Sequence, residues 1–302
     1  MKAVFLKTLV TAIMGVATVA AQAAVEVKTA HGNVQFKLPL SDNIVVYDVG
    51  ALDSIHALGI TPKGTSTPVN VSYLQDVYKQ ATVVGSLFEP DLEKLNAFKP
   101  EAVIIGGRMA PKYNDMKPFV PVVDMSTPQG SVYSISRTKE TMTEYGKLFA
   151  QEAKAAELNQ ALDTAFEQTK KLTQGKKALM VLVNGQKVAS YSVGSRFGYL
   201  FDDLGFIPLD ERKSEGRHGN PISFEFIKEK NPDWLIVMDR TTATNAKGDS
   251  AKVVLDNALL KDVTAFKNNQ VIYLDSSAYL ASGGYQQMML ELKLLRDAMA
   301  DK

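Results

Sequence analysis

The chain has 302 residues, of which 45% are hydrophobic and 22% charged, with 34 Lys and Arg against 33 Asp and Glu. This composition excludes a disordered or collagen-like chain, and the near-zero net charge gives no sign of a nucleic-acid-binding protein. The absence of cysteine excludes disulfides, thiolate metal sites, a cysteine nucleophile and a lipid-modified cysteine. At about 100–200 residues per domain, the length leaves room for two domains.

The first 23 residues have the pattern of a secretory signal peptide. Lys2 and Lys7 form a positive end, residues 9–20 are apolar, and the sequence Ala-Gln-Ala places a cleavage site near Ala23. The alternative is a transmembrane anchor, but the uncharged run falls short of the roughly 20 residues that span a bilayer. We therefore expect a signal peptide over 1–23 and export of the mature protein.

Past residue 23, short β-branched runs alternate with helical patterns, which favours an α/β fold. The expected strands cover residues 44–48, 81–85, 102–106, 121–125, 178–183, 234–239 and 271–274. Between the two groups of strands, the apolar spacing predicts two helices.

The second of these helices is predicted from Glu152 to Thr173. It would be about 33 Å long at 1.5 Å per residue, which suits a rigid connector between two lobes. The alternative is an ordinary surface helix of one lobe. The expected division is an N-terminal lobe over 24–150, a connecting helix over 151–175 and a C-terminal lobe over 176–302.

An internal repeat supports two lobes built on one plan. Residues 93–108 align without gaps on residues 225–240, and each copy predicts a short helix that stops before a proline, then a buried strand. Three residue types share one register, namely Glu93, Pro100 and Arg108 with Glu225, Pro232 and Arg240. Because ligands of open α/β sheets bind beyond the carboxyl ends of the strands, Arg108 and Arg240 are expected to point into one site. Chance similarity of two α/β segments is the alternative.

A third arginine lies in a glycine-rich turn. Arg196 follows Gly194 and Ser195 in a segment that leads from a strand ending near Tyr191 into a helix. Backbone amides at the helix start, together with a guanidinium, would form an anion site, although a purely structural turn fits the same pattern. With Arg108 and Arg240, Arg196 would complete a basic triad suited to carboxylates or catecholates.

Two further residues are candidate metal ligands. His218 lies in a loop without an apolar pattern, and Tyr279 follows the strand predicted over 271–274. The alternative is that both are ordinary loop residues. Together, an imidazole and a phenolate oxygen suit Fe(III), which favours anionic oxygen and accepts nitrogen. No zinc-type ligand spacing appears in the sequence, so we expect any metal to arrive already chelated.

From about Val34 to the end, the chain resembles the periplasmic substrate-binding proteins of ABC importers with one rigid connecting helix, and among them the catecholate-siderophore binders of the enterobactin type. The resemblance is carried by Glu-x6-Pro-x7-Arg, Gly-Ser-Arg-Phe-Gly, Arg-His-Gly-Asn-Pro-Ile-Ser-Phe-Glu, Met-Asp-Arg and the closing residues 259–274. It implies two Rossmann-like lobes joined by one long helix, with the ligand cleft between them. It also implies a monomer in the periplasm, with no intrinsic cofactor.

The resemblance further implies roles for the residues above. The triad Arg108, Arg196 and Arg240 would hold an anionic ferric catecholate siderophore, and His218 and Tyr279 would complete the Fe3+ coordination when the siderophore supplies only four oxygens. Glu93 and Glu225 would dock against arginines of the inner-membrane ABC permease. The alternative for these two glutamates is that they are solvated carboxylates near helix N-termini, where the helix dipole favours acids.

Two other functions stay open at this point. Carriers of haem, cobalamin or hydroxamate siderophores share the fold, so the ligand depends on the triad and the His/Tyr pair alone. An exported enzyme is the more distant alternative. The chain contains no G-x-S-x-G, H-E-x-x-H, P-loop or G-x-G-x-x-G motif, and we therefore expect a binding protein rather than an enzyme.

Overall fold

The structure is a computed structural model that describes residues 24–37, 39–127, 133–213 and 219–300. The segment predicted to be a signal peptide lies outside these residues. Within them, no helix combines the length and the apolar character needed to cross a membrane.

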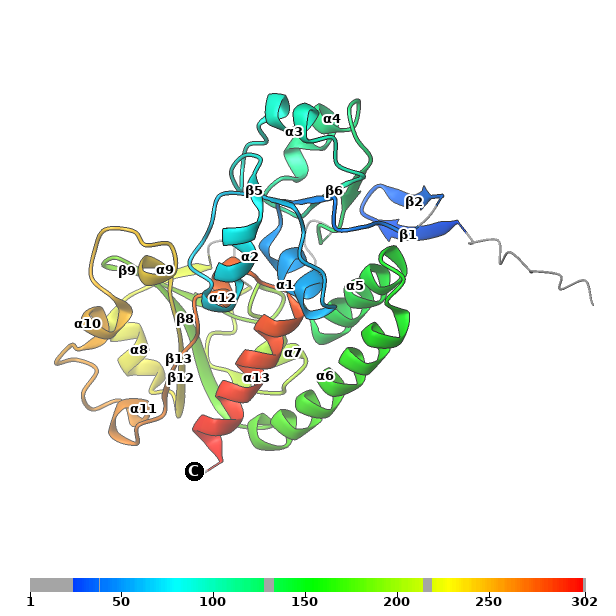
Figure 1. The fold of residues 1–302 in the computed structure, drawn as a ribbon. Coiled ribbons are helices and arrows are strands. Elements are labelled where there is room, and N and C mark those ends of the chain that lie inside the picture. Colours follow the sequence, from blue (N-terminus) through cyan, green and yellow to red (C-terminus); the bar gives the residue numbers. More distant parts are fainter. Residues whose placement is uncertain (1–23, 38, 128–132, 214–218, 301–302) are drawn as a thin grey trace, which may run out of the picture.

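The first lobe is built on a five-stranded parallel sheet in the order β5-β4-β3-β6-β7, at the top of Figure 1. Its strands are β3 Val45–Val46, β4 Gly64–Thr65, β5 Thr82–Val83, β6 Val103–Ile105 and β7 Val122–Asp124. Its helices are α1 Val49–Ala57, η1 Ser72–Leu74, α2 Gln75–Gln80, α3 Leu92–Phe98, η2 Ala110–Lys112 and α4 Tyr113–Met116. An antiparallel hairpin that was not predicted, β1 Val25–Thr29 and β2 Gly32–Phe36, precedes this sheet.

The second lobe is built on a mixed sheet in the order β11-β9-β8-β12-β13, with β10 also paired to β8. Strands β8, β12 and β13 are parallel, whereas β9 runs antiparallel to β8 and β11. The strands are β8 Lys177–Asn184, β9 Lys187–Tyr191, β10 Ile207–Pro208, β11 Asn220–Ile222, β12 Trp234–Asp239 and β13 Val271–Tyr273. The helices are α7 Tyr199–Asp202, α8 Phe224–Lys230, α9 Arg240–Ala243, α10 Ala251–Leu255, α11 Thr264–Lys267 and α12 Ser277–Leu280.

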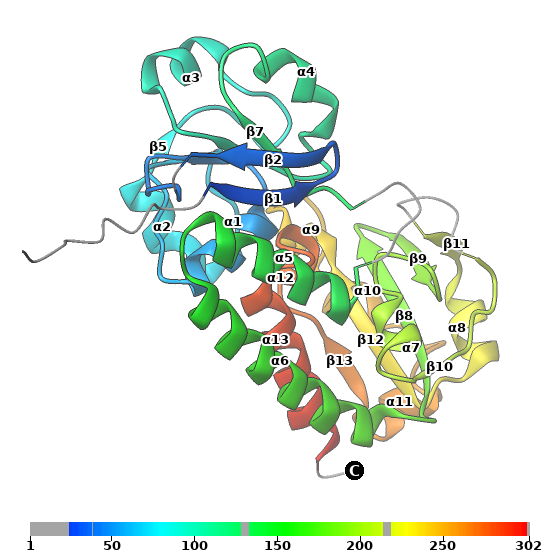
Figure 2. The same ribbon diagram turned by 90° about the vertical axis from the view of Figure 1, so that its right-hand side faces the viewer.

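Three longer helices lie along the seam between the lobes (Figure 2). They are α5 Ile135–Leu148, α6 Glu152–Thr173 and α13 Tyr285–Met299. Helix α6 has the bounds that the sequence predicts, and α13 packs against both α6 and α1. The fold is therefore the expected α/β arrangement of two Rossmann-like lobes joined by a long helix, with α13 as a second element that touches both lobes.

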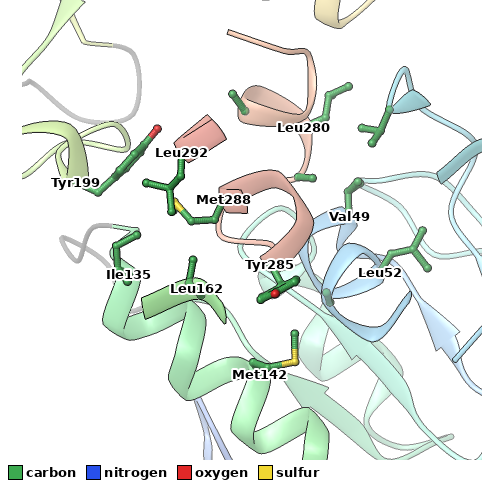
Figure 3. Packing of buried hydrophobic residues seen from close by; sticks show 14 of the residues in the cluster. Val49, Leu52, Ile135, Met142, Leu162, Tyr199, Leu280, Tyr285, Met288 and Leu292 are labelled. Atoms are coloured by element: carbon green, nitrogen blue, oxygen red, sulfur yellow. The ribbon is translucent and has the colours of Figure 1, made fainter. Parts of the chain in front are cut away.

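One continuous apolar core fills this seam. Figure 3 shows Val49 and Leu52 of α1 and Met142 of α5 packed toward Met288 and Leu292 of α13. All five side chains are almost completely buried. Burial of such side chains is worth about 1.5–3 kcal/mol each, so the seam stabilises one mutual arrangement of the lobes.

Both copies of the internal repeat fold alike. Helices α3 and α8 are each seven residues long, and each has its N-terminus capped by a side chain, from Asp91 or Ser223. Each ends at a residue in the left-handed conformation, Lys99 or Asn231, directly before the aligned proline. The strand that follows, β6 or β12, then delivers its arginine to the carboxyl edge of its sheet.

A buried carboxylate of the first lobe anchors the start of α13. Asp53 of α1 accepts hydrogen bonds from the Gln286 and Gln287 backbone amides at 2.6 and 2.9 Å, and from the Tyr73 hydroxyl at 2.5 Å. A second carboxylate on α13, Glu291, accepts a hydrogen bond from the Tyr199 hydroxyl at 2.6 Å. Burial raises the pKa of both carboxyls to about 7.

These raised pKa values predict that the free energy of unfolding decreases as the pH rises from about 4 to about 7. In the unfolded chain the two carboxyls titrate near pH 4, so between these pH values the native state binds more protons. The stabilisation is complete below the unfolded pKa and is lost as the pH passes through the folded pKa. Urea unfolding at a series of pH values measures this, with the Asp53→Asn, Glu291→Gln double variant as the comparison. Below pH 7, the free energy of unfolding should change with pH more steeply in the wild-type protein than in the double variant. Parallel curves of this free energy against pH would contradict the prediction.

Candidate functional site

Three arginines from three separate elements meet at the short helix α12. Arg108 lies beyond β6 in the first lobe, Arg240 opens α9 directly after β12, and Arg196 lies in the turn between β9 and α7. Each guanidinium donates to a group of Tyr279. The convergence that the repeat predicts is therefore present, and Tyr279 lies at its centre.

Arg108 connects the two lobes. Its Nη1 donates to the Leu280 carbonyl oxygen at 3.0 Å, and its Nη2 donates to the Tyr279 carbonyl oxygen at 2.9 Å. These carbonyls belong to the end of α12, where the helix has no further amides to satisfy them. An arginine of the first lobe thus caps a helix of the second.

Arg196, like Arg108 and Arg240, is half-buried. Its Nη2 donates to the Tyr279 carbonyl oxygen at 3.0 Å and to the Ser282 Oγ at 2.6 Å. Its guanidinium carbon lies 4.5 Å from the centre of the Tyr279 ring, within cation–π range. Burial lowers the pKa of Arg196, and its buried Nε has no hydrogen-bond partner among the described residues. An unsatisfied buried donor carries a free-energy cost that a bound acceptor would relieve.

Arg240 is held on two sides. Its Nε donates to the Tyr279 hydroxyl oxygen at 2.8 Å, and its Nη1 donates to the Asn184 Oδ1 at 2.9 Å. An arginine has five N–H donors, and these two bonds use two of them. Within the described part of the chain the other donors of Arg240 have no partner, so they can bind a ligand.

Among the residues that the structure describes, no carboxylate contacts the three arginines directly. Every acceptor that they contact is a carbonyl, a hydroxyl or an amide oxygen, and none of the ion pairs among the described residues includes them. Asp48 is a charged neighbour of Arg108. Burial raises the pKa of Asp48, and the attraction of Arg108 opposes that shift. The site thus concentrates positive charge on planar, hydrogen-bonding groups, which suits an anion with several oxygen atoms.

A small cavity between the lobes adjoins α12. It has a volume of about 40 Å³ and is lined from the first lobe by residues that include Asp48, Gly106 and Ser126, and from the segment after α12 by Ser282 and Gly283. This volume holds a few water molecules rather than a siderophore. The seam beside the triad is therefore lined in part by polar groups and is too small in this structure for the ligand.

The glycine-rich turn does not supply the expected backbone anion site. The Gly194 amide donates to Asp202 Oδ2 at 3.1 Å, and the Ser195 and Gly198 amides donate to carbonyls of the same turn. Helix α7, which follows, has only four residues. These bonds favour the alternative of a structural turn, and the Arg196 side chain is the contribution of this turn to the cluster.

The other predicted residues divide into two groups. His218 lies outside the described residues, so its role as an iron ligand stays a prediction. Glu93 and Glu225 are both exposed in the first turns of α3 and α8. The pKa of Glu225 is lowered by hydrogen bonds from its own backbone amide and from Ser223. Both glutamates are therefore accessible to a partner.

Sequence reasoning missed two residues that hold the arginines in place. Asn184 ends β8 and precedes Gly185, so the pair has the appearance of an ordinary hairpin turn. Ser282 follows Tyr279 by three residues in a segment without a motif. The only sequence signal was their position at the carboxyl end of a predicted strand or just after Tyr279.

Comparisons with known proteins place this geometry in a family. The profile described as "Periplasmic binding protein" matches residues 44–278. The petrobactin-binding protein YclQ of Bacillus subtilis is 32% identical over 266 residues, which cover 85% of this chain and 82% of YclQ. The crystal structure of YclQ superposes with a TM-score of 0.84 at 29% identity and covers 93% of this chain and 100% of the other.

Two further relatives have comparable coverage. The periplasmic catecholate-siderophore binding protein VctP from Vibrio cholerae superposes with a TM-score of 0.80 at 28% identity, covering 91% of this chain and 100% of VctP. The ferric-anguibactin-binding protein FatB of Vibrio anguillarum is 28% identical over 78% of this chain and 75% of its own length. The names of all three relatives specify siderophores, of more than one kind.

Proposed function

The chain belongs to the periplasmic binding protein family, and from that premise we propose that it captures a ferric catecholate siderophore in the periplasm and delivers it to an inner-membrane ABC permease. Members of this family serve transport rather than catalysis, and the relatives above bind siderophores. The proposal goes further than the family on three points, which are the catecholate, the periplasmic location and the docking glutamates.

The observation that carries the catecholate proposal is the convergence of three arginines whose direct partners are all neutral. A ferric tris-catecholate carries about three negative charges spread over oxygen atoms, and guanidiniums bind such oxygens through charge-assisted hydrogen bonds. Haem presents a large apolar ring, which suits aromatic and aliphatic pocket walls. The described site instead offers Arg108, Arg196 and Arg240 around one tyrosine.

Absorption of the loaded protein distinguishes the ligand classes. The mature protein is mixed separately with ferric bis-catecholate, ferric tris-catecholate, haem and cobalamin, then desalted. Retention of the visible catecholate charge-transfer band, with no Soret or corrin band in the other samples, is the expected result. A retained Soret or corrin band without catecholate binding would mean that the ligand is haem or cobalamin instead of a catecholate.

Iron coordination gives a prediction that separates ligation from general contact. A tetradentate bis-catecholate leaves two of the six iron positions open, and His218 and Tyr279 would fill them. His218→Ala is expected to weaken bis-catecholate binding about tenfold or more, while tris-catecholate binding changes little because its oxygens already fill the iron. Tyr279→Phe also removes an acceptor of Arg240, so it should weaken the binding of both chelates, with a loss about tenfold larger for the bis-catecholate. Fluorescence titrations with both chelates measure the contrast. Equal losses for the two chelates would mean that these side chains line the pocket without ligating the metal.

A further inference from the structure

The turn between β8 and β9 is fastened to the start of α9 at two points. The Asn184 Oδ1 accepts a hydrogen bond from Arg240 Nη1 at 2.9 Å, and the Gly185 amide donates to the buried Thr241 hydroxyl at 2.8 Å. Gly185 has a φ of +56°, the left-handed conformation that a two-residue hairpin turn requires. The turn therefore has a fixed position relative to Arg240.

Two acceptors fix the plane of the Arg240 guanidinium. The phenol oxygen of Tyr279 accepts from Nε and Asn184 accepts from Nη1, so the two acceptors restrain rotation of the planar group. Without Asn184, a single bond to Tyr279 would remain, and the long side chain would regain rotamer freedom that binding must then remove. Asn184 thus acts on the ligand through Arg240.

The chemical type of residue 184 matters as much as its position. An asparagine oxygen accepts from a guanidinium without cancelling its charge, whereas an aspartate at this distance would form an ion pair. The other acceptors around the triad are neutral as well, including the Ser282 hydroxyl and the backbone carbonyls of α12. Within the described part of the chain, the groups that hold Arg196 and Arg240 by hydrogen bonds carry no charge, and Asp48 is an acidic neighbour of Arg108 only.

We propose that Asn184 is a positioning residue that orients Arg240 while leaving its charge uncompensated, and that it thereby sets the preference of the site for highly anionic ligands. This inference rests on the proposed function for the class of ligand. The orientation of Arg240 is a property of the ligand-free protein and is measurable on its own.

The first arm of the test needs no ligand. The Arg240 Nε–H resonance, assigned by its loss in Arg240→Lys, is recorded in the wild-type protein, in Asn184→Ala and in Asn184→Asp. We expect the resonance to shift or broaden in Asn184→Ala and to stay sharp in Asn184→Asp, which keeps the acceptor. Gln186→Ala is the matched control because Gln186 lies on the same turn and contacts Asp249 instead. An unchanged resonance in Asn184→Ala would overturn the positioning role.

The second arm measures affinity for ferric tris-catecholate and bis-catecholate, which carry about three and about one negative charges. Asn184→Ala should weaken the binding of both chelates about threefold to tenfold, the range expected for one lost hydrogen bond. Asn184→Asp should weaken tris-catecholate binding about tenfold more than bis-catecholate binding, since the added charge repels the more anionic complex. Equal losses for the two chelates in Asn184→Asp would overturn the charge role.

The two arms also separate this inference from the proposed function. If the wild-type protein binds neither chelate, the proposed ligand is wrong and the charge preference falls with it, while the resonance still decides whether Asn184 orients Arg240. If the wild-type protein binds both chelates and the Asn184 variants behave like Gln186→Ala, the proposed function stands and the inference is wrong.

Discussion

Alanine substitution of any one of Arg108, Arg196 and Arg240 should weaken the binding of ferric tris-catecholate about tenfold or more. Each guanidinium would make charge-assisted hydrogen bonds to the complex, and such bonds are worth about 1.5–3 kcal/mol, or about tenfold to a hundredfold in affinity. Arg196 has, in addition, a buried Nε without a partner among the described residues, which an oxygen of the complex would satisfy. Equilibrium titration of each variant measures the effect.

Two controls test whether such losses are local. Arg296→Ala removes another arginine that donates to a backbone carbonyl, that of Ala165, but it lies on α13 outside the cluster. Its affinity should match that of the wild-type protein. Lysine at each triad position should also weaken binding, because an ammonium group lacks the planar fork. Unchanged affinity in all three alanine variants would mean that the triad does not bind the siderophore.

Charge reversal at both exposed glutamates should abolish productive docking. With Glu93→Arg and Glu225→Arg combined, arginines on the permease would face arginines on both lobes, and like charges at an interface cost several kcal/mol. Siderophore-dependent stimulation of ATP hydrolysis by the permease should fall tenfold or more, while siderophore affinity stays unchanged. Reconstituted permease in lipid vesicles provides the measurement.

The matched control for docking is Glu229→Arg. Glu229 is exposed on the same helix as Glu225 but near its carboxyl end. ATP hydrolysis that survives the double reversal, or that fails equally with Glu229→Arg, would contradict the assigned docking residues.

The sequence allowed prediction of the elements that local patterns define. Helix α6 was predicted with its observed bounds because its apolar periodicity is long and uninterrupted by proline. Six of the seven predicted strands contain the observed one, since buried parallel strands are short apolar runs, and the strand predicted over 178–183 lies within the longer β8. The β1–β2 hairpin was missed, although Val25, Val27, Val34 and Phe36 alternate with polar residues as strand residues do.

The sequence allowed prediction of the arginines of the candidate site but not of the residues that hold them in place. The repeat placed Arg108 and Arg240 at the carboxyl ends of equivalent strands, and the structure brings both to α12. The acceptors that hold them, Asn184 and Ser282, come from distant turns, and only tertiary packing brings these together with the arginines. The role of α13 was missed for the same reason, because the contact of its first turn with Asp53 joins residues more than 230 positions apart.

The most direct test of siderophore binding at the arginine triad is a titration of the mature protein with ferric tris-catecholate. The titration is followed by the emission of Trp234, the only tryptophan. Trp234 is buried at the start of β12, six residues before Arg240 and about 20 Å away along the strand, so quenching reports energy transfer to the bound complex. If the triad binds the complex, quenching should saturate at one complex per protein. It should be abolished when Arg108, Arg196 and Arg240 are all replaced by alanine. Absence of saturable quenching in the wild-type protein, or equal quenching in the triple variant, would contradict it.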